Sequence, residues 1–225
     1  MIFPINLPDR LPLLLDDPHR ILVGTGMQVS MHQPSPLRFM GRLFNTRLNL
    51  PQQITPQSLS DIIGTPVTSL MGMDIISQFR VYFSYHAQTI DFDNEDGGMP
   101  GIQVPVDHFH GIPIVEVEIN GKPRRMIVNS GTKISYLKSE FTAGIVPIEN
   151  VKDFYSVDTP FTTPIFPIET RLIGHIFPVR YGNPPVEVSQ VLTQARVDGI
   201  LGSDLFYAFD LGLDMRTSRL YCQPV

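Results

Sequence analysis

The chain has 225 residues, of which 42% are hydrophobic and 17% charged, and its formal net charge is -5. This length allows one all-β domain or two lobes of about a hundred residues each, and the mild negative charge does not suggest a nucleic-acid or anionic-membrane partner. The 21 prolines and the sparse charge favour strands and turns over long surface helices.

The redox and targeting signals are those of an intracellular protein. Cys222 is the single cysteine, so the chain cannot form an internal disulfide, which fits a reducing compartment. Residues 1–9 lack the basic head and long apolar run of a secretory signal. No stretch approaches the ~20 apolar residues that a membrane span requires. We therefore expect a cytoplasmic protein without a membrane partner.

The first half of the chain has the signals of a β-rich unit. Residues 11–15 are apolar and turn into a second apolar strand that ends at Gly24. A further strand is predicted within residues 37–50. A short apolar helix is then predicted to begin at Asp74, whose side chain suits a helix N-cap. Residues 81–90 follow as a predicted hairpin.

A polar, glycine-rich run over residues 94–101 is interpreted as a linker. It divides the chain into an N-terminal lobe (1–93) and a C-terminal lobe (102–225). Residues 91–97 also match a calcium-binding loop in part, but the glycine is one place late and the closing glutamate is missing. These departures favour a solvated linker over a calcium site.

The second half repeats the order of elements and adds an insert. Residues 112–119 contain a clean alternation of apolar and acidic side chains before an Asn-Gly turn, which is a strong hairpin signal. The returning apolar strand ends at Asn129. An insert over residues 138–167 is rich in aromatic residues and is predicted to form a flap over a cleft. A second short helix is predicted to begin at Asp204, again as its N-cap.

Two motifs recur in the same order in both halves. Residues 20–30 and 125–135 each carry an apolar strand, an X-Thr/Ser-Gly triplet and a second strand that leaves through a β-branched residue and a serine. Residues 70–79 and 200–209 each read apolar-apolar-Gly-X-Asp before a short apolar helix. Chance produces such an ordered pair much less often than either motif alone, so the sequence predicts an internal duplication.

These motifs resemble those of the retropepsin-like aspartic protease family, the proteases of retroviruses and retrotransposons and their cellular relatives. The matching motifs and their flanking strands span most of the chain. The resemblance implies an all-β, retropepsin/pepsin-like acid protease fold, with two duplicated β-barrel lobes, each with one short helix, in one monomeric chain. It also implies an interface sheet built from residues 2–7, 89–93, 102–106 and 219–225, with a cleft between the lobes.

The positions of the family's catalytic aspartates are occupied here by Gly24 and Asn129. The family's reaction needs two carboxyl groups around a water, one ionised and one protonated. Glycine has no side chain, and an amide neither gains nor loses a proton near neutral pH. We therefore expect the family's chemistry to be lost, although the enzyme class of the resemblance is aspartic endopeptidase.

The remaining residues of both triplets are kept. The resemblance implies that Thr25 and Ser130 hydrogen-bond across to the opposite lobe and lock the two loops together. Gly26 and Gly131 would allow the tight turn of each loop.

Several explanations compete for this pattern. The leading hypothesis is a non-catalytic pseudo-protease that binds an extended peptide in the interlobe cleft. The alternative is an aspartic endopeptidase that was inactivated by substitution at Asn129, or that retains activity through other residues or through deamidation of Asn129. The glycine at position 24 argues against a single inactivating change. A structural module whose cleft is filled by its own side chains is the third hypothesis.

Other candidate sites are weaker. Residues 107–110 contain two histidines, but no third ligand is evident, so we expect no metal and no cofactor. Asp61 and Asp198 are conceivable replacement carboxylates. Asp198 lies in a run common to the family, so a turn or packing role is favoured for it.

Overall fold

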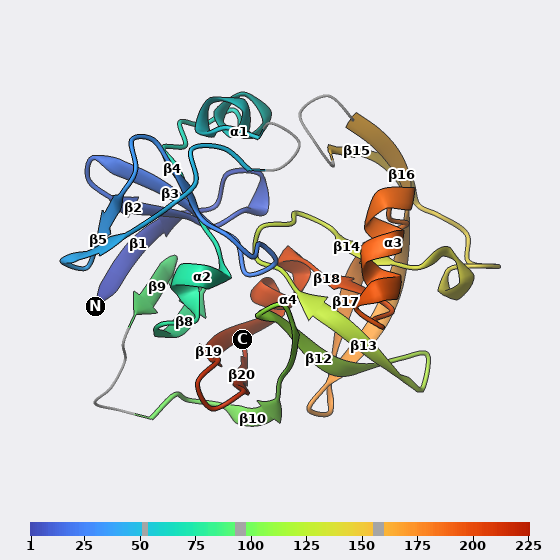
Figure 1. Cartoon of the computed structure of the whole chain (residues 1–225). Helices are drawn as coiled ribbons and strands as arrows, with labels where there is room; N and C mark the ends of the chain where they lie inside the picture. The colour runs from blue at the N-terminus through green and yellow to red at the C-terminus, as the bar shows by residue number, and fades with distance from the viewer. Residues whose placement is uncertain (51–53, 93–97, 155–159) are drawn as a thin grey trace.

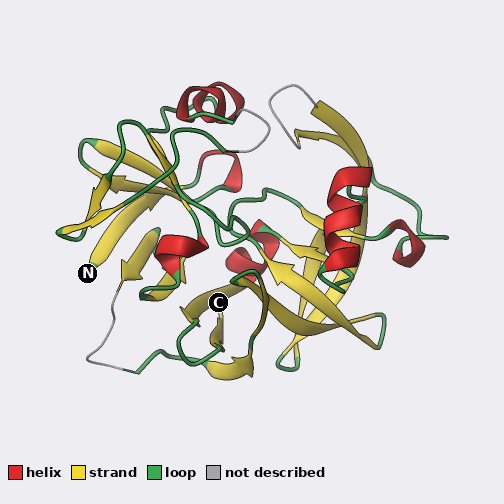
Figure 2. Ribbon diagram, viewed as in Figure 1, coloured by secondary structure: helices red, strands yellow, loops and turns green. Residues whose placement is uncertain are grey.

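The computed structural model describes residues 1–50, 54–92, 98–154 and 160–225. It consists mainly of β-strands, with a few short helices (Figure 2). The all-β class expected from the sequence is therefore confirmed.

The first half of the chain builds the strands on the left of Figure 1. In order, its elements are β1 (Ile2–Asn6), the 3-10 turn η1 (Pro8–Arg10), β2 (Leu13–Asp16), β3 (His19–Val23), β4 (Met31–His32), β5 (Leu37–Phe39), β6 (Arg42–Phe44), α1 (Pro56–Ile63), β7 (Ser69–Met71), α2 (Met73–Ile76), β8 (Arg80–Ser84) and β9 (Thr89–Phe92).

The second half follows the same plan with longer strands. Its elements are β10 (Ile102–Pro105), β11 (Asp107–Phe109), β12 (Ile112–Ile119), β13 (Lys122–Val128), β14 (Ser135–Leu137), the 3-10 turn η3 (Ser139–Phe141), β15 (Glu149–Phe154), β16 (Pro160–Leu172), β17 (His175–Gly182), α3 (Val186–Gln194), β18 (Gly199–Leu201), α4 (Ser203–Ala208), β19 (Phe209–Asp214) and β20 (Arg219–Pro224).

The internal repeat seen in the sequence has a structural counterpart. In the first half, β3 pairs in parallel with β7, and Val23 lies opposite Met71. In the second half, β13 pairs in parallel with β18, and Val128 lies opposite Leu201. Each parallel pair brings the end of an X-Thr/Ser-Gly strand beside the start of a Gly-X-Asp motif.

A single sheet joins the two halves. Its strands run in the order β10-β20-β19-β8-β9-β1-β2-β3-β7-β4, so a block of three strands from the second half continues into a block of seven from the first. The four predicted interface segments contribute β1, β9, β10 and β20. The direct junction is formed by β8 and β19, with Phe83 opposite Leu211. The sheet therefore crosses the boundary between the proposed lobes, and its strands extend from β10 at the bottom of Figure 1 to β1–β4 at the upper left.

The prediction of two β-barrels is wrong for the first half. In the second half, β12 pairs with both β13 and β16, which closes a ring through β18, β14 and β17. The first half has no such closure among its described strands, because β5 and β6 form a separate two-stranded sheet. The strand predicted over residues 37–50 is instead this short hairpin, followed by irregular chain.

The prediction of one short helix per lobe is also incomplete. Each half contains a second, longer helix, α1 or α3, which the sequence reading had missed. Helix α1 begins with a capping box in which the Thr55 side chain accepts from the Ser58 backbone N–H and the Ser58 side chain accepts from the Thr55 N–H. It ends at Gly64, which has a left-handed φ of 71°.

The predicted capping roles of Asp74 and Asp204 are wrong. Helices α2 and α4 have glycine N-caps, Gly72 and Gly202, and neither aspartate makes a side-chain cap hydrogen bond. Both aspartates lie inside the first turn and point to other partners. Asp74 accepts hydrogen bonds from the Ser30 backbone N–H and hydroxyl. The short helices are thus held to neighbouring loops rather than capped by their own acids.

The insert over residues 138–167 contains a β-hairpin. Strand β15 pairs antiparallel with the start of β16, from Glu149 opposite Ile165 to Phe154 opposite Pro160. Residues 155–159 lie outside the described residues, as do residues 93–97 of the runs proposed as linker and calcium loop. No described helix is long and apolar enough to cross a membrane.

Candidate functional site

The two X-Thr/Ser-Gly loops meet at the centre of the molecule. The Thr25 backbone N–H donates to Ser130 Oγ at 3.1 Å, and the Ser130 N–H donates to Thr25 Oγ1 at 3.0 Å. The two hydroxyls in turn donate to the carbonyls of the strands across from them, Val128 and Val23, at 2.9 and 2.7 Å. Thr25 and Ser130 are fully buried. Four mutual hydrogen bonds in a dry environment fix the two loops relative to each other.

The side chain of Asn129 is held by the same loops. Its Oδ1 accepts from the backbone N–H groups of Gly26 at 3.1 Å and Gly131 at 2.9 Å. Its Nδ2 donates to Thr132 Oγ1 at 2.6 Å. One N–H of the amide remains for another acceptor, because an amide nitrogen carries two donors. Asn129 is thus oriented by its neighbours and faces the space between the lobes.

Gly24 is not required by the backbone. Its φ lies outside the left-handed region, and an added Cβ would meet only the Met27 side chain, at 3.1 Å from Cγ. Gly26 differs, because a Cβ there would lie 2.6 Å from Asn129 Oδ1. Gly26 therefore makes room for the Asn129 amide, whereas Gly24 only leaves the floor of the site without a side chain at that position.

A cavity of about 340 Å³ opens above these loops and is lined by both halves. Gly24, Gly26, Asn129 and Gly131 form part of its floor. The wall from the first half is almost entirely apolar and includes α1; it consists of Leu11, Leu22, Met27, Leu50, Ile54, Leu59, Ile63 and Leu70. We call this wall the apolar hollow.

The opposite wall comes from the β15–β16 hairpin, from β14 and from the loop before β14. It carries aromatic rings of Phe154, Phe161 and Tyr136 together with the carboxyl group of Asp153. The Tyr136 hydroxyl donates to this carboxyl group. Burial raises the pKa of Asp153 above its ordinary value, and the bonds from Tyr136 and from the Phe154 N–H offset only part of that rise. Burial likewise raises the pKa of Tyr136.

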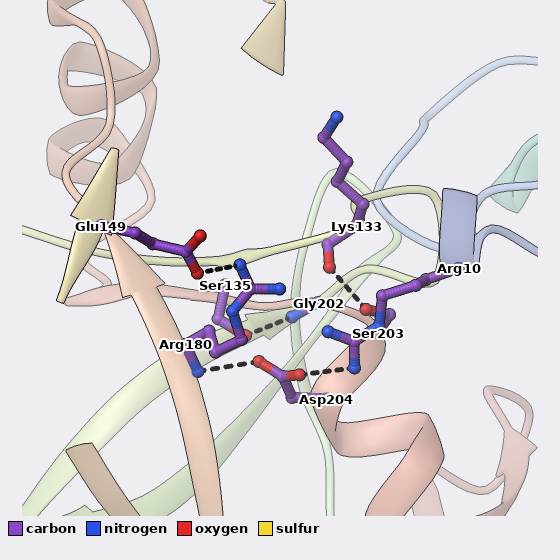
Figure 3. Close-up of polar contacts among 8 residues, drawn as sticks. All are labelled: Arg10, Lys133, Ser135, Glu149, Arg180, Gly202, Ser203 and Asp204. Atoms are coloured by element: carbon purple, nitrogen blue, oxygen red, sulfur yellow. Dashed lines mark hydrogen bonds and ion pairs between the residues drawn. The ribbon is translucent and has the colours of Figure 1, made fainter. Parts of the chain in front are cut away.

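Two ion pairs tie the start of the chain to the second half beside the cavity, and Figure 3 shows the one between Arg10 and Asp204. Arg10 Nη2 lies 2.6 Å from Asp204 Oδ1, and the Asp204 side chain is only 7% exposed. Lys133 Nζ lies 3.0 Å from Asp9 Oδ2. Asp9 and Arg10 have positive φ values of 46° and 67°, which are uncommon for residues with a Cβ. The two residues of this strained turn, Asp9 and Arg10, are thus the ones that form ion pairs with the second half.

The Asp204 carboxylate is also the acceptor for the β17 backbone. Its Oδ2 accepts from the Arg180 N–H at 2.8 Å, while the Arg180 guanidinium pairs with Glu149 at 2.6 Å. Figure 3 shows Asp204 between Arg10 and Arg180. Asp204 thus joins three parts of the chain instead of capping its helix.

The remaining sequence candidates lie away from the cavity. Asp198 accepts from the Arg125 backbone N–H at 3.1 Å, which is a packing role. Asp61 lies on α1 and accepts from Gln57 at 2.8 Å. In the strand before β12, only His108 lies within β11, and His110 follows it in a turn. The described residues contain no group of three potential metal ligands.

Four residues of the cavity wall had not been singled out from the sequence: Asp9, Lys133, Tyr136 and Asp153. Asp153 lies within the insert expected to act as a flap, but a single acidic residue in a polar strand carries no signal of its own. Only the antiparallel pairing of β15 with β16 and the position of β14 bring it beside Tyr136.

Comparisons with known proteins add no family. A scan against protein-family models finds no match to the chain, and a search of curated proteins finds no match either. The functional argument therefore rests on the residues and their geometry.

Proposed function

We propose that this protein is a single-chain relative of retropepsin-like aspartic proteases that binds an extended peptide without cleaving it. The resemblance stated from the motifs supplies the fold family, and the internal pairing of β3 with β7 and β13 with β18 supports it. The peptide would occupy the cavity between the two halves, under the β15–β16 hairpin.

One observation carries this proposal. The reciprocal bonds between Thr25 and Ser130 hold two loops rigidly at the floor of a cavity in which neither loop presents a carboxyl group. Preorganised loops under a cavity suit binding, because little conformational entropy is lost when a ligand enters. The free amide N–H of Asn129 is a suitable donor for a peptide carbonyl.

At the cavity floor, positions 24 and 129 carry no group that can transfer the protons that hydrolysis by the family's mechanism requires. Asn129 cannot act as an acid or base near neutral pH, and Gly24 offers no functional group. Catalytic groups that act as a unit lose nearly all of their effect when even one is removed. The cavity therefore keeps a binding shape but lacks the pair that would activate water.

An aspartic endopeptidase inactivated at position 129 is the second candidate, and one observation favours it. Asn129 Oδ1 accepts from two backbone N–H groups, and Thr132 Oγ1 is a hydroxyl that can donate as well as accept. A carboxylate would be satisfied in this position without rearrangement. Gly24 still leaves such an enzyme without its second carboxyl group.

The binding proposal is tested with fluorescein-labelled hexapeptide libraries and the full chain, by fluorescence polarisation. We expect saturable binding to the wild-type protein and its loss in Met27→Trp, which fills the cavity floor. Leu43→Trp is the matched control, since Leu43 is 60% exposed and does not line the cavity. Absence of binding to the wild type, or equal binding to both variants, contradicts the proposal.

The same libraries test the lack of catalysis. At acidic pH we expect no cleavage by the wild type or by Gly24→Asp or Asn129→Asp alone, because each still lacks one carboxyl group. Cleavage by the double variant would indicate that the cavity accepts a peptide in a reactive geometry. Cleavage by carefully purified wild-type protein would instead refute the non-catalytic assignment.

A further inference from the structure

Asp153 lies on the cavity wall and forms no direct ion pair with a described residue. It is largely withdrawn from water, and burial is the main influence on its pKa. Among the described residues, its hydrogen-bond donors are the Tyr136 hydroxyl and the backbone N–H of Phe154. Each oxygen thus has one donor, and because a carboxylate has about four acceptor sites, it can still accept hydrogen bonds from a ligand in the cavity that it lines.

The cations around the cavity are committed to other acids. Lys133 pairs with Asp9 at 3.0 Å, and Arg10 pairs with Asp204 at 2.6 Å. No lysine, arginine or histidine nitrogen of the described residues lies within 4 Å of the Asp153 carboxylate, and the stretches outside the described ranges contain none of these residue types. Lys133 lowers the pKa of Asp153 from a greater distance and its partner Asp9 raises it, so no described cation forms a direct ion pair with the Asp153 carboxylate.

The neighbourhood favours a ligand cation over an anion. Among the described residues, the charged groups on the cavity lining are Asp9, Lys133 and Asp153. With Lys133 and Asp9 neutralising each other, the ionised Asp153 leaves one negative charge. The rest of the lining is chiefly apolar, which strengthens an ion pair because the surrounding medium screens it weakly. A ligand cation at Asp153 would repay the cost of burying its carboxylate.

We propose that Asp153 determines specificity in the cavity by pairing with a lysine or arginine side chain of the bound peptide. A large apolar side chain of the same peptide occupies the apolar hollow on the other wall. This inference rests on the proposed peptide-binding function and adds the chemistry of the segment selected: apolar and basic, rather than apolar alone. The Tyr136 hydroxyl acts as a positioning group that orients the carboxylate toward the ligand.

The test uses the full chain and acetylated, amidated hexapeptides that share a leucine and differ at one scanned position: lysine, norleucine or glutamate. Norleucine keeps the length of the lysine stem without its charge. For the wild type we expect the lysine peptide to bind about tenfold more tightly than the norleucine peptide and the glutamate peptide more weakly than both, as for a partly desolvated charge pair. The lysine preference should decrease in high salt.

Asp153→Asn is the decisive variant, because it keeps the size of the side chain and an acceptor for Tyr136. We expect the norleucine peptide to bind it as it binds the wild type and the lysine preference to vanish. Asp61→Asn is the matched control and should keep the preference, since Asp61 lies on α1 away from the cavity lining.

The outcomes separate the two proposals. If the wild type binds the peptides without preferring lysine, the role assigned to Asp153 is overturned. The same holds if the lysine preference is insensitive to salt and survives in Asp153→Asn. In both cases the proposed peptide-binding function still stands. No binding by any of the peptides or libraries overturns the proposed function and this inference with it.

Discussion

Gly24 and Asn129 occupy equivalent places in the two X-Thr/Ser-Gly loops, yet they differ in the contacts that hold them. Asn129 is held by three hydrogen bonds from or to its own loop and the opposite one. Gly24 is held only through its backbone, whose N–H donates to the Met71 carbonyl at 3.0 Å. At the residue scale the site is therefore asymmetric: one position is constrained by its side-chain contacts and the other is not.

Replacement of the loop glycines should expose this asymmetry. We expect Gly24→Ala to change the free energy of unfolding by less than about 1 kcal/mol, because only the flexible Met27 side chain must move. Gly26→Ala should cost about 3 kcal/mol, because its Cβ would overlap the Asn129 amide. Urea unfolding followed by circular dichroism measures both. Equal effects would show that the loop repacks freely.

The contact of Arg10 with Asp204 should be worth more than an exposed ion pair. Removal of Arg10 leaves a carboxylate that is only 7% exposed with one partner fewer. We expect Arg10→Met to lower the free energy of unfolding by about 2 kcal/mol. Arg171→Met is the control, because Arg171 and Glu118 are 3.8 Å apart and both more than 40% exposed, and it should cost less than about 0.5 kcal/mol. Similar losses for the two variants would contradict the role assigned to Arg10.

The raised pKa of Asp153 has a consequence for stability. A carboxyl group whose pKa is higher in the folded than in the unfolded state stabilises the protein below its unfolded pKa, and this stability is lost as the pH rises through the folded pKa. Burial is the cause of the shift. Relative to Asp153→Asn, the wild type should therefore lose stability as the pH is raised from about 4. Urea unfolding between pH 4 and 7 measures the difference, and a constant difference would contradict a raised pKa.

At the scale of elements, α1 is a helix with local capping signals that forms part of the cavity wall. Its apolar face contributes Leu59 and Ile63 to the apolar hollow, and these two side chains are buried. The helix has few turns, so its ends contribute much of its intrinsic stability. The capping box at Thr55 therefore supports one wall of the proposed binding site.

Loss of that cap should be measurable. We expect Thr55→Val, which removes the hydroxyl acceptor for the Ser58 N–H at 3.1 Å, to cost about 1 kcal/mol of unfolding free energy. Thr193→Val in α3 is a matched control, because the Thr193 hydroxyl only bonds to the Ser189 carbonyl on an exposed helix surface, and it should be nearly neutral. Thermal unfolding of both variants by calorimetry tests the difference.

At the scale of the whole molecule, the two halves are not independent lobes joined by a tether. Strands β8 and β19 pair directly, and buried side chains of both halves form one continuous core that includes Phe83, Phe206 and Leu211. The ring of Phe206 contacts those of Phe83 and Tyr85 at centroid distances of 5.3 and 5.2 Å. Separation of the halves would expose this core.

We therefore expect the chain to unfold as one cooperative unit. In hydrogen–deuterium exchange with mass spectrometry near the urea midpoint, peptides from β3 and β13 should gain the unfolded mass envelope at the same rate. Earlier unfolding of one half would contradict a shared core. A control at low urea should show the β8 and β19 amides among the slowest to exchange, because both are interior strands of the shared sheet and pair with each other at the junction of the halves.

The sequence reading succeeded where a local signal was strong. The Asn-Gly turn at 120–121 adopts positive φ values of 52° and 71° between β12 and β13, as such hairpins require. The capping signal of α1, with Thr55, Pro56 and Gly64 at its ends, was present in the sequence but not used. Asp74 and Asp204 show the opposite error, since an aspartate near a helix start can bond to distant partners as well as to its own helix.

The sequence by itself determined the strand-rich class and the two repeated motifs with no carboxyl group at their X positions, Gly24 and Asn129, because each of these follows from residue types at fixed spacings. Only the tertiary structure decided the open first half, the sheet through β8 and β19, and the meeting of Tyr136 with Asp153 beside Lys133 and Asp9. These features depend on contacts between residues far apart in the chain. Such contacts are selected by the packing of a common core and leave no periodic pattern in any single segment.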